Sequence, residues 1–326
     1  MKFLKVILWL LIIVIVIAGG FLLYVNIALP DAGEVPEITI EPTHERLERG
    51  EYLATHVMVC ISCHSPRDWD QYAGPIIKAK MGGGGDVFGH KKGLPGNFYP
   101  RNLTPYHIGD WTDGELLHAI AAGINKKGDP LFPLMPYHDY GTLDKEDLYS
   151  VIAFLRTLPP VESEIKDSKA DFPLGIIMNF MPEEPKFSKR PDESNIIAYG
   201  EYLVKAAACY HCHTPQDKGQ FIDSLRFAGG MEFPMKTGGI SVAANITPDK
   251  ATGIGLWSEE AFVNKFKFYL DSDYTGEKVA QGEMNTEMPW REYAGMKEKD
   301  LRAIYAYLRT LKPIKQQVVK FKPNNH

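Results

Sequence analysis

The sequence of 326 residues contains only four cysteines and no long block of charge of one sign. Its formal net charge is −5, and the charged residues are dispersed along the chain. Nucleic acids require a basic stripe, which is missing here, so no nucleic acid is expected among the partners. Runs of alternating apolar and polar residues are also scarce, which predicts a mainly α fold.

All four cysteines lie in two copies of one motif, which reads CISCH in the first copy and CYHCH in the second. On a helical turn, residues three apart project to one face, so both thiols of a copy can add to the vinyl groups of one haem. The histidine that follows reaches the iron through a ring nitrogen. The sequence therefore predicts two haem c groups. Their predicted ligands are Cys60, Cys63 and His64 in the first copy and Cys209, Cys212 and His213 in the second.

Zinc, a redox dithiol and a disulfide framework are the competing interpretations of this motif. A structural zinc site needs a second ligand pair at suitable spacing, and the other cysteine pair is far along the chain. A thioredoxin-like dithiol lies in a βαβ pattern, which does not appear here. A disulfide framework would leave the histidine in both copies unexplained. Covalent haem is the interpretation that we favour.

The segments around the two motifs repeat as well. RGEYLATHVMVCISCHSPRD in the first half matches YGEYLVKAAACYHCHTPQD in the second, and the endings LRTL also match. A repeat of about 115 residues is a duplicated domain, since solenoid repeats have periods of about 20 to 50 residues. Within the halves, Thr112 with Glu115 predicts a capping box at one helix start, and Ser258 predicts the corresponding start in the second half.

Haem iron needs a sixth ligand, and a methionine in a loop is one option. Met135 in LMPY and Met288 in EMPW occupy matched places, each before a proline and shortly before the last helix of its half. They are the predicted axial ligands opposite the histidines. His138 remains an alternative to Met135. Weaker methionine candidates lie in the glycine-rich loops, at Met81 and Met231.

The N-terminal region contains an apolar run over residues 6–29, preceded by Lys2 and Lys5. A spanning helix needs roughly 20 apolar residues, and this run is longer than the 7 to 15 of a cleaved signal. Neither an Ala-x-Ala cleavage site nor a lipidation cysteine follows it. We therefore expect a retained anchor in the inner membrane, with the remaining chain on the periplasmic side by the positive-inside rule.

With these motifs in place, the chain resembles a membrane-anchored dihaem cytochrome c. Over most of residues 45–315 it is similar to the multihaem cytochrome c subunit of membrane-bound alcohol and gluconate dehydrogenases. Besides the haem motifs, the resemblance rests on NITPDKATGIGLWSEEAF and its counterpart NLTPYHIGDWTDGEL. That family commonly carries three haem motifs, whereas this chain carries two.

The resemblance implies a tandem pair of class I cytochrome c-like domains. The strap between them contains FPLGIIMNFMP, too apolar for a pure linker, and is expected to pack on one or both domains. The expected parts are a transmembrane anchor (1–30), a linker (31–45), a first cytochrome c domain (46–160), the strap (161–195), a second cytochrome c domain (196–315) and a C-terminal tail (316–326).

The expected function is single-electron transfer between respiratory partners, without a catalytic site of its own. The candidate partners are a dehydrogenase, a quinol-oxidising complex, a soluble cytochrome and a terminal oxidase. Two alternatives stay open. One is a peroxidase-like dihaem enzyme with an open coordination position, and the other is a subunit that mainly docks and anchors a dehydrogenase.

Overall fold

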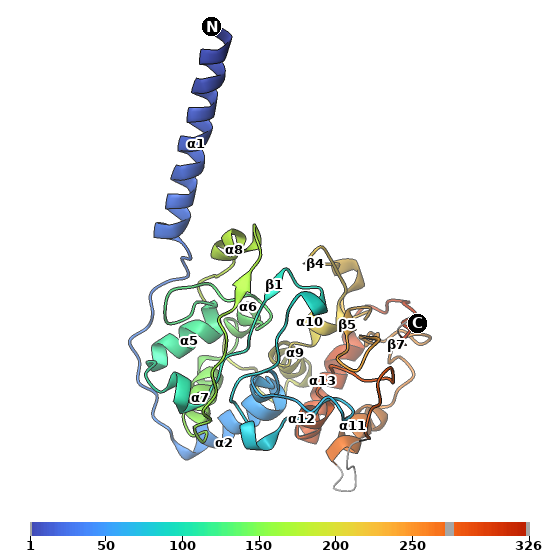
Figure 1. The fold of residues 1–326 in the computed structure, drawn as a ribbon. Coiled ribbons are helices and arrows are strands. Elements are labelled where there is room, and N and C mark those ends of the chain that lie inside the picture. Colours follow the sequence, from blue (N-terminus) through green and yellow to red (C-terminus); the bar gives the residue numbers. More distant parts are fainter. Residues whose placement is uncertain (1, 271–276, 324–326) are drawn as a thin grey trace.

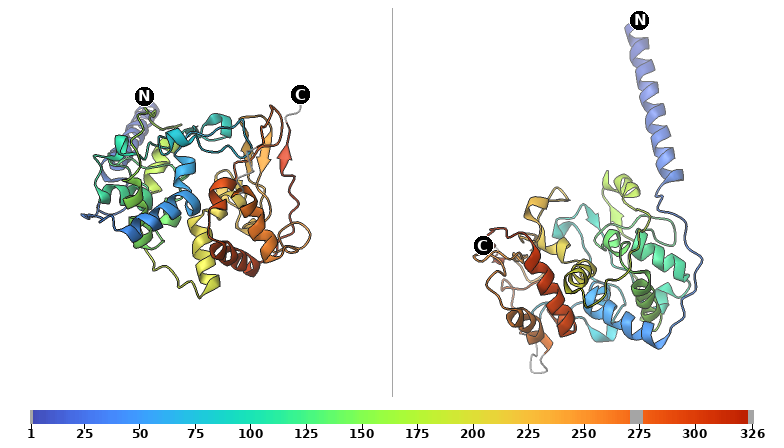
Figure 2. Two further views of the ribbon diagram at one scale, coloured as in Figure 1. Left: turned by 90° about the horizontal axis from the view of Figure 1, so that it is seen from below. Right: turned by 180° about the vertical axis from the view of Figure 1, so that it is seen from behind.

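The computed structural model describes residues 2–270 and 277–323. Helices make up 43% of it, so the expected mainly α class is confirmed. One long helix, α1, projects away from a rounded body in which helices surround irregular loops (Figure 1). The first half of that body (residues 44–160) lies beside the second half (residues 196–315), as two further views show (Figure 2).

Most helices are short. In and around the first half they are α1 Lys2–Ala28, α2 His44–Tyr52, a π-helical turn Leu53–Val57, α3 Cys60–Cys63, α4 Pro105–Ile108, α5 Asp113–Ala122, α6 Tyr137–Tyr140, α7 Lys145–Leu155 and α8 Leu174–Ile177. In the second half they are α9 Ile196–Ala206, α10 Cys209–His213, α11 Glu259–Lys267, α12 Trp290–Ala294 and α13 Glu298–Thr310.

Short antiparallel strands connect the loops. They were not predicted from the sequence. β1 Gly96–Asn97 pairs with β2 Lys169–Ala170, and β3 Gln216–Asp217 pairs with β4 Gln220–Phe221. A three-stranded sheet has the order β5 Glu232–Pro234, β6 Ile240–Val242, β7 Phe321–Lys322. With two or three residues each, these strands are too short to show an alternating pattern in the sequence.

The first and last helices of each half cross at a glycine. A Cβ at Gly50 of α2 would lie 1.8 Å from the Ser150 carbonyl oxygen of α7. A Cβ at Gly200 of α9 would lie 2.0 Å from the Ala303 carbonyl oxygen of α13. Both distances are far inside van der Waals contact, so the two crossings require residues without a side chain.

The predicted helix starts are present. Thr112 accepts a hydrogen bond from the Glu115 amide, and the Glu115 carboxylate accepts one from the Thr112 amide, which completes the capping box of α5. Ser258 accepts a hydrogen bond from the Ala261 amide at the start of α11. The π-helical turn after α2 was not predicted. It absorbs one extra residue, because the segment from Tyr52 to Cys60 is one residue longer than its counterpart in the second half.

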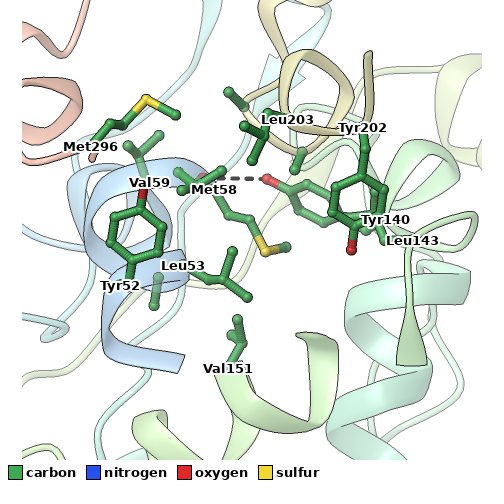
Figure 3. Close-up of a cluster of buried hydrophobic side chains, with 14 of the residues drawn as sticks. Tyr52, Leu53, Met58, Val59, Tyr140, Leu143, Val151, Tyr202, Leu203 and Met296 are labelled. Atoms are coloured by element: carbon green, nitrogen blue, oxygen red, sulfur yellow. Dashed lines mark hydrogen bonds between the residues drawn. The ribbon is translucent and has the colours of Figure 1, made fainter. Parts of the chain in front are cut away.

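One hydrophobic core runs through both halves. Leu53 and Val151 of the first half and Leu203 of the second belong to the same buried cluster (Figure 3). Two tyrosines of this cluster bind carboxylates across the boundary. The Tyr52 hydroxyl donates to Asp300 Oδ2 at 2.5 Å, and the Tyr202 hydroxyl donates to Asp147 Oδ2 at 2.7 Å. The first helix of each half is thereby joined to the last helix of the other.

The strap between the halves packs on the first half, as its apolar composition led us to expect. The Val161 carbonyl accepts a hydrogen bond from Asn102, and β2 pairs with β1. Near its end, Arg190 forms an ion pair with Asp147 of α7. Between these attachments, a charge-free stretch over residues 172–181 reaches up beside α1 (Figure 1).

Candidate functional site

Each CxxCH motif begins directly after a residue in the left-handed region. Val59 precedes α3 with φ 48°, and Ala208 precedes α10 with φ 51°. Left-handed backbone is strained for a residue with a side chain, and above all for β-branched valine. Such strain persists where the surrounding structure enforces it, and it is concentrated at functional sites. The same unusual turn therefore presents both motifs.

The motif histidines are half-buried and held in one orientation. His64 Nδ1 lies 2.7 Å from the Arg101 carbonyl oxygen, and His213 Nδ1 lies 2.7 Å from the Ala244 carbonyl oxygen. A carbonyl can only accept a hydrogen bond, so Nδ1 carries the proton and Nε2 keeps its lone pair. Burial also lowers the pKa of both histidines, which favours the neutral form. A neutral imidazole with a fixed Nε2 lone pair is suited to bind a metal.

The two carbonyl acceptors are positioned by an Asn-x-Thr turn that follows each of them. Asn102 Oδ1 accepts hydrogen bonds from the amide and the hydroxyl of Thr104. Asn245 Oδ1 accepts the same pair from Thr247. All four side chains are buried. The sequence analysis noted the repeated segments NLTP and NITP but missed this function, although the Asn-x-Thr repeat itself was the available signal.

The cysteines of both motifs are free thiols in a densely packed region. Cys60 and Cys209 are half-buried against the hydrophobic core, whereas the thiols of Cys63 and Cys212 remain accessible. Loss of hydration by the surrounding protein raises the pKa of Cys212 to about 12, and the nearby Cys63 adds to that rise. Cys63 of the first motif therefore lies near Cys212 of the second.

The methionine segments are linked to the motifs by nearby tyrosines. Met135 and Met288 are half-buried against the core. Five residues beyond each, a tyrosine hydroxyl binds the backbone just before a motif. Tyr140 donates to the Met58 carbonyl at 3.4 Å, drawn as a dashed line in Figure 3, and Tyr293 donates to the Ala207 carbonyl at 2.7 Å. The short helices α6 and α12 thus bring each Met-Pro pair towards its motif.

The alternative ligands have different environments. His138 is exposed, and its ring lies against that of Tyr137, with centroids 4.4 Å apart and planes inclined by 41°. Met81 and Met231 are half-buried. Within residues 2–270 and 277–323, no three His, Cys, Asp or Glu side chains gather in a group that could hold a metal ion. The zinc interpretation therefore gains no additional ligands from the fold.

Residues from the first half hold the Met288 segment. Arg67 and Lys92 both form ion pairs with Glu287, at 3.3 and 2.5 Å. Asn285, which is fully buried, accepts a hydrogen bond from the Ala73 amide at 2.8 Å. The loop of the first half that follows its motif is thus part of the second site.

The sequence that forms these sites is similar to sequences of known proteins. Residues 197–312 match the family model of cytochrome c. The chain contains a cytochrome c domain. His213 and Gly200, where α9 crosses α13, both lie inside the matched residues.

Several relatives of this chain carry descriptive names. It is 30% identical to the alcohol dehydrogenase (quinone) cytochrome c subunit of Gluconacetobacter polyoxogenes, over 82% of this chain and 56% of the relative. It is 30% identical to the gluconate 2-dehydrogenase cytochrome c subunit of Pantoea cypripedii, over 81% and 59%. It is 28% identical to a diheme cytochrome c-type protein of Cereibacter sphaeroides, over 78% and 82%. The chain spans somewhat more than half the length of the two dehydrogenase subunits.

Proposed function

We propose that this protein is a membrane-anchored dihaem cytochrome c that carries single electrons between respiratory partners. The observation that carries the proposal is the pair of CxxCH motifs whose histidines donate Nδ1–H to a backbone carbonyl, at 2.7 Å in both halves. Each motif follows the same left-handed turn, and each half has the same crossing of first and last helices. We therefore take the halves to be a tandem pair of class I cytochrome c-like domains.

The residues present fit covalent haem in both halves. The thiols of each motif would form the two thioether bonds, and Nε2 of His64 or His213 would bind the iron. When bound, haem supplies a centre that alternates between ferric and ferrous states. The protein would hold the neutral histidine and would supply a second ligand to the iron. Met135 and Met288 are our candidates for that ligand, because α6 and α12 bring them towards the motifs.

Two axial ligands from the protein favour electron transfer over catalysis at the iron. A haem with both axial positions filled leaves none open for a substrate, whereas a peroxidase-like enzyme needs an open position. Arg67, three residues after His64, forms an ion pair with Glu287, next to Met288, and this contact between the two sites further supports electron transfer between them. We accordingly propose that the chain has no catalytic site of its own.

The site of action that we propose is the periplasmic face of the inner membrane. Among the residues that the structure describes, α1 is the one helix long and apolar enough to cross a membrane, with a mean hydropathy of 3.2. Two relatives are named as cytochrome c subunits of dehydrogenases, and we infer that a dehydrogenase is also the electron donor here. The acceptor would be another respiratory protein.

Haem attachment is tested most directly by removing one cysteine pair at a time. The wild-type protein should stay coloured after acid-acetone extraction, because thioether-linked haem is not extracted. The double variants Cys60→Ala/Cys63→Ala and Cys209→Ala/Cys212→Ala should each lose half of the haem absorbance per chain. A colourless wild-type protein after extraction would disprove covalent attachment. A high-spin ferric spectrum at neutral pH would favour the enzyme alternative.

A further inference from the structure

The strap carries an apolar segment on the outside of the body, where solvent would ordinarily favour polar residues. Residues 172–181 contain no charged side chain. Phe172 is 87% exposed, Ile177 is 47% exposed and Phe180 is 52% exposed. Met178 alone in this stretch is a buried apolar side chain, which fixes the segment to the body. Contiguous exposed apolar groups of this kind mark interaction surfaces.

The same segment contacts the N-terminal helix. The rings of Phe180 and Phe21 are stacked, with centroids 6.3 Å apart and planes inclined by 10°. The α8 helix lies to one side of the lower end of α1 (Figure 1). The segment is therefore held at the level of the last turns of α1.

The level of Phe21 along α1 sets the depth of the segment. Phe21 lies seven residues before Ala28, which corresponds to about 10 Å along the helix axis. α1 has 27 residues, or about 40 Å, whereas the hydrocarbon core is about 30 Å thick. The first polar residue after the lysines is Asn26. Phe21 thus lies within about two turns of the edge of the hydrocarbon.

We propose that residues 172–181 insert into the outer surface of the same bilayer that α1 spans, as a second membrane contact. The occupant of this apolar surface is lipid, because a group stacked on Phe21 shares the depth of Phe21. Interfacial segments typically bury their apolar face about 5–10 Å into the boundary of headgroups and acyl chains. The inference rests on the proposed anchoring by α1.

The second contact would fix the orientation of the body. A single helix joined to the body by a linker leaves the body free to tilt, whereas two contacts define one face towards the membrane. In the view of Figure 1, the membrane would then lie above the body, and α8 would face it. Redox partners in the membrane would meet the protein on a constant side.

Photo-crosslinking of the full-length protein in vesicles tests the proposal. The probe is a phosphatidylcholine with a diazirine on its acyl chain, and adducts are mapped by mass spectrometry. We expect adducts in α1 and in residues 172–181. The internal control is Leu256, which is also apolar and 76% exposed but distant in sequence from both membrane contacts, and it should remain unlabelled.

A matched pair of variants sharpens the result. Phe172→Asp/Ile177→Asp should reduce adducts in the strap at least fivefold relative to those in α1, while Leu256→Asp should leave both unchanged. Strap labelling no higher than that of Leu256, with α1 labelled, would overturn this inference alone. Absence of adducts in α1 would overturn the proposed anchoring as well. Should the double variant fold poorly, the wild-type adduct map decides the question.

Discussion

The two halves have the same helix crossing and the same histidine support, but their buried aspartates are paired very differently. Asp147 of α7 accepts hydrogen bonds from Arg49, Arg190 and Tyr202, so both of its oxygens are satisfied. Asp300 of α13 occupies the matching place and accepts one hydrogen bond, from Tyr52. No donor among the described residues reaches its Oδ1 atom.

One substitution between the repeats explains most of this difference. Arg49 in the first half is replaced by Tyr199 in the second, at the position before the crossing glycine. The second half therefore depends on a tyrosine of the first half to satisfy its buried carboxylate, whereas the first half has arginines nearby. Two halves with the same helix crossing can therefore differ in how much the buried carboxylate of each depends on a side chain of the other half.

The largest expected effect concerns the proposed methionine ligands, where the halves should behave alike. Met288→Ala and Met135→Ala should each lower the midpoint potential of one haem, on the order of 0.2 V, since axial ligands set haem potentials over about 0.8 V. Loss of the thioether stabilises the ferric state. Redox titration followed by visible spectroscopy measures the change, together with the weak Fe(III)–thioether band in the red.

Two control variants accompany this measurement. Met284→Ala changes an exposed methionine of the same loop and should leave both potentials unchanged. His138→Ala should also have no effect if Met135 is the ligand. A normal potential in Met288→Ala would instead direct attention to Met231.

The second largest effect is expected from changing the helix crossing, which is also common to both halves. Gly50→Ala and Gly200→Ala should each lower the free energy of unfolding by about 3 kcal/mol, because a Cβ would overlap the facing carbonyl oxygen and force the helices apart. Urea unfolding measures the loss. Gly175→Ala is the control, since its Cβ would meet no atom closer than 4.0 Å. A loss below 1 kcal/mol in either half would show that its crossing can relax.

The same residues show which features can be predicted from the sequence and which cannot. The motifs at Cys60 and Cys209 and the capping box at Thr112 are local patterns, which short-range geometry determines. The pairing of Tyr52 with Asp300 depends on which helix faces which across the two halves, and no local pattern contains that information. The carbonyl acceptor of His64 is likewise contributed by a residue far along the chain. The sequence repeats identify equivalent positions in the two halves. They do not reveal that the tyrosine at such a position binds a carboxylate of the other half.

A smaller effect is expected from the two tyrosines that bind the buried aspartates, and its size should differ between the halves. Tyr52→Phe leaves the Asp300 carboxylate, which is 1% exposed, without a side-chain hydrogen bond, and should cost about 2 kcal/mol of unfolding free energy. Tyr202→Phe leaves Asp147 with its arginines and should cost about 1 kcal/mol. Adding Asp300→Asn to Tyr52→Phe should cost less than the sum of the single changes, since the two groups interact. Equal losses for the two tyrosines would mean that the arginines do not matter.

The smallest effect comes from Arg190, and it should vanish in acid. Burial alone would raise the pKa of Asp147, but Arg49, Tyr202 and Arg190 together hold it below the ordinary value. A carboxyl group with a lowered pKa contributes stability above its unfolded value of about 3.9, and that contribution is lost as the pH falls further. Arg190 is partly exposed, so Arg190→Ala should cost only about 0.5 kcal/mol at pH 7.

The pH profile then distinguishes this ion pair from simple packing. The difference in unfolding free energy between the wild type and Arg190→Ala should be constant above pH 5 and should close as the pH falls below about 3.9, because a protonated Asp147 no longer attracts the guanidinium group. Lys189→Ala, a neighbouring exposed cation, should show no difference at any pH. A gap that persists unchanged at pH 2.5 would mean that Arg190 contributes through its aliphatic stem, and Arg49 would then be the one arginine whose charge stabilises Asp147.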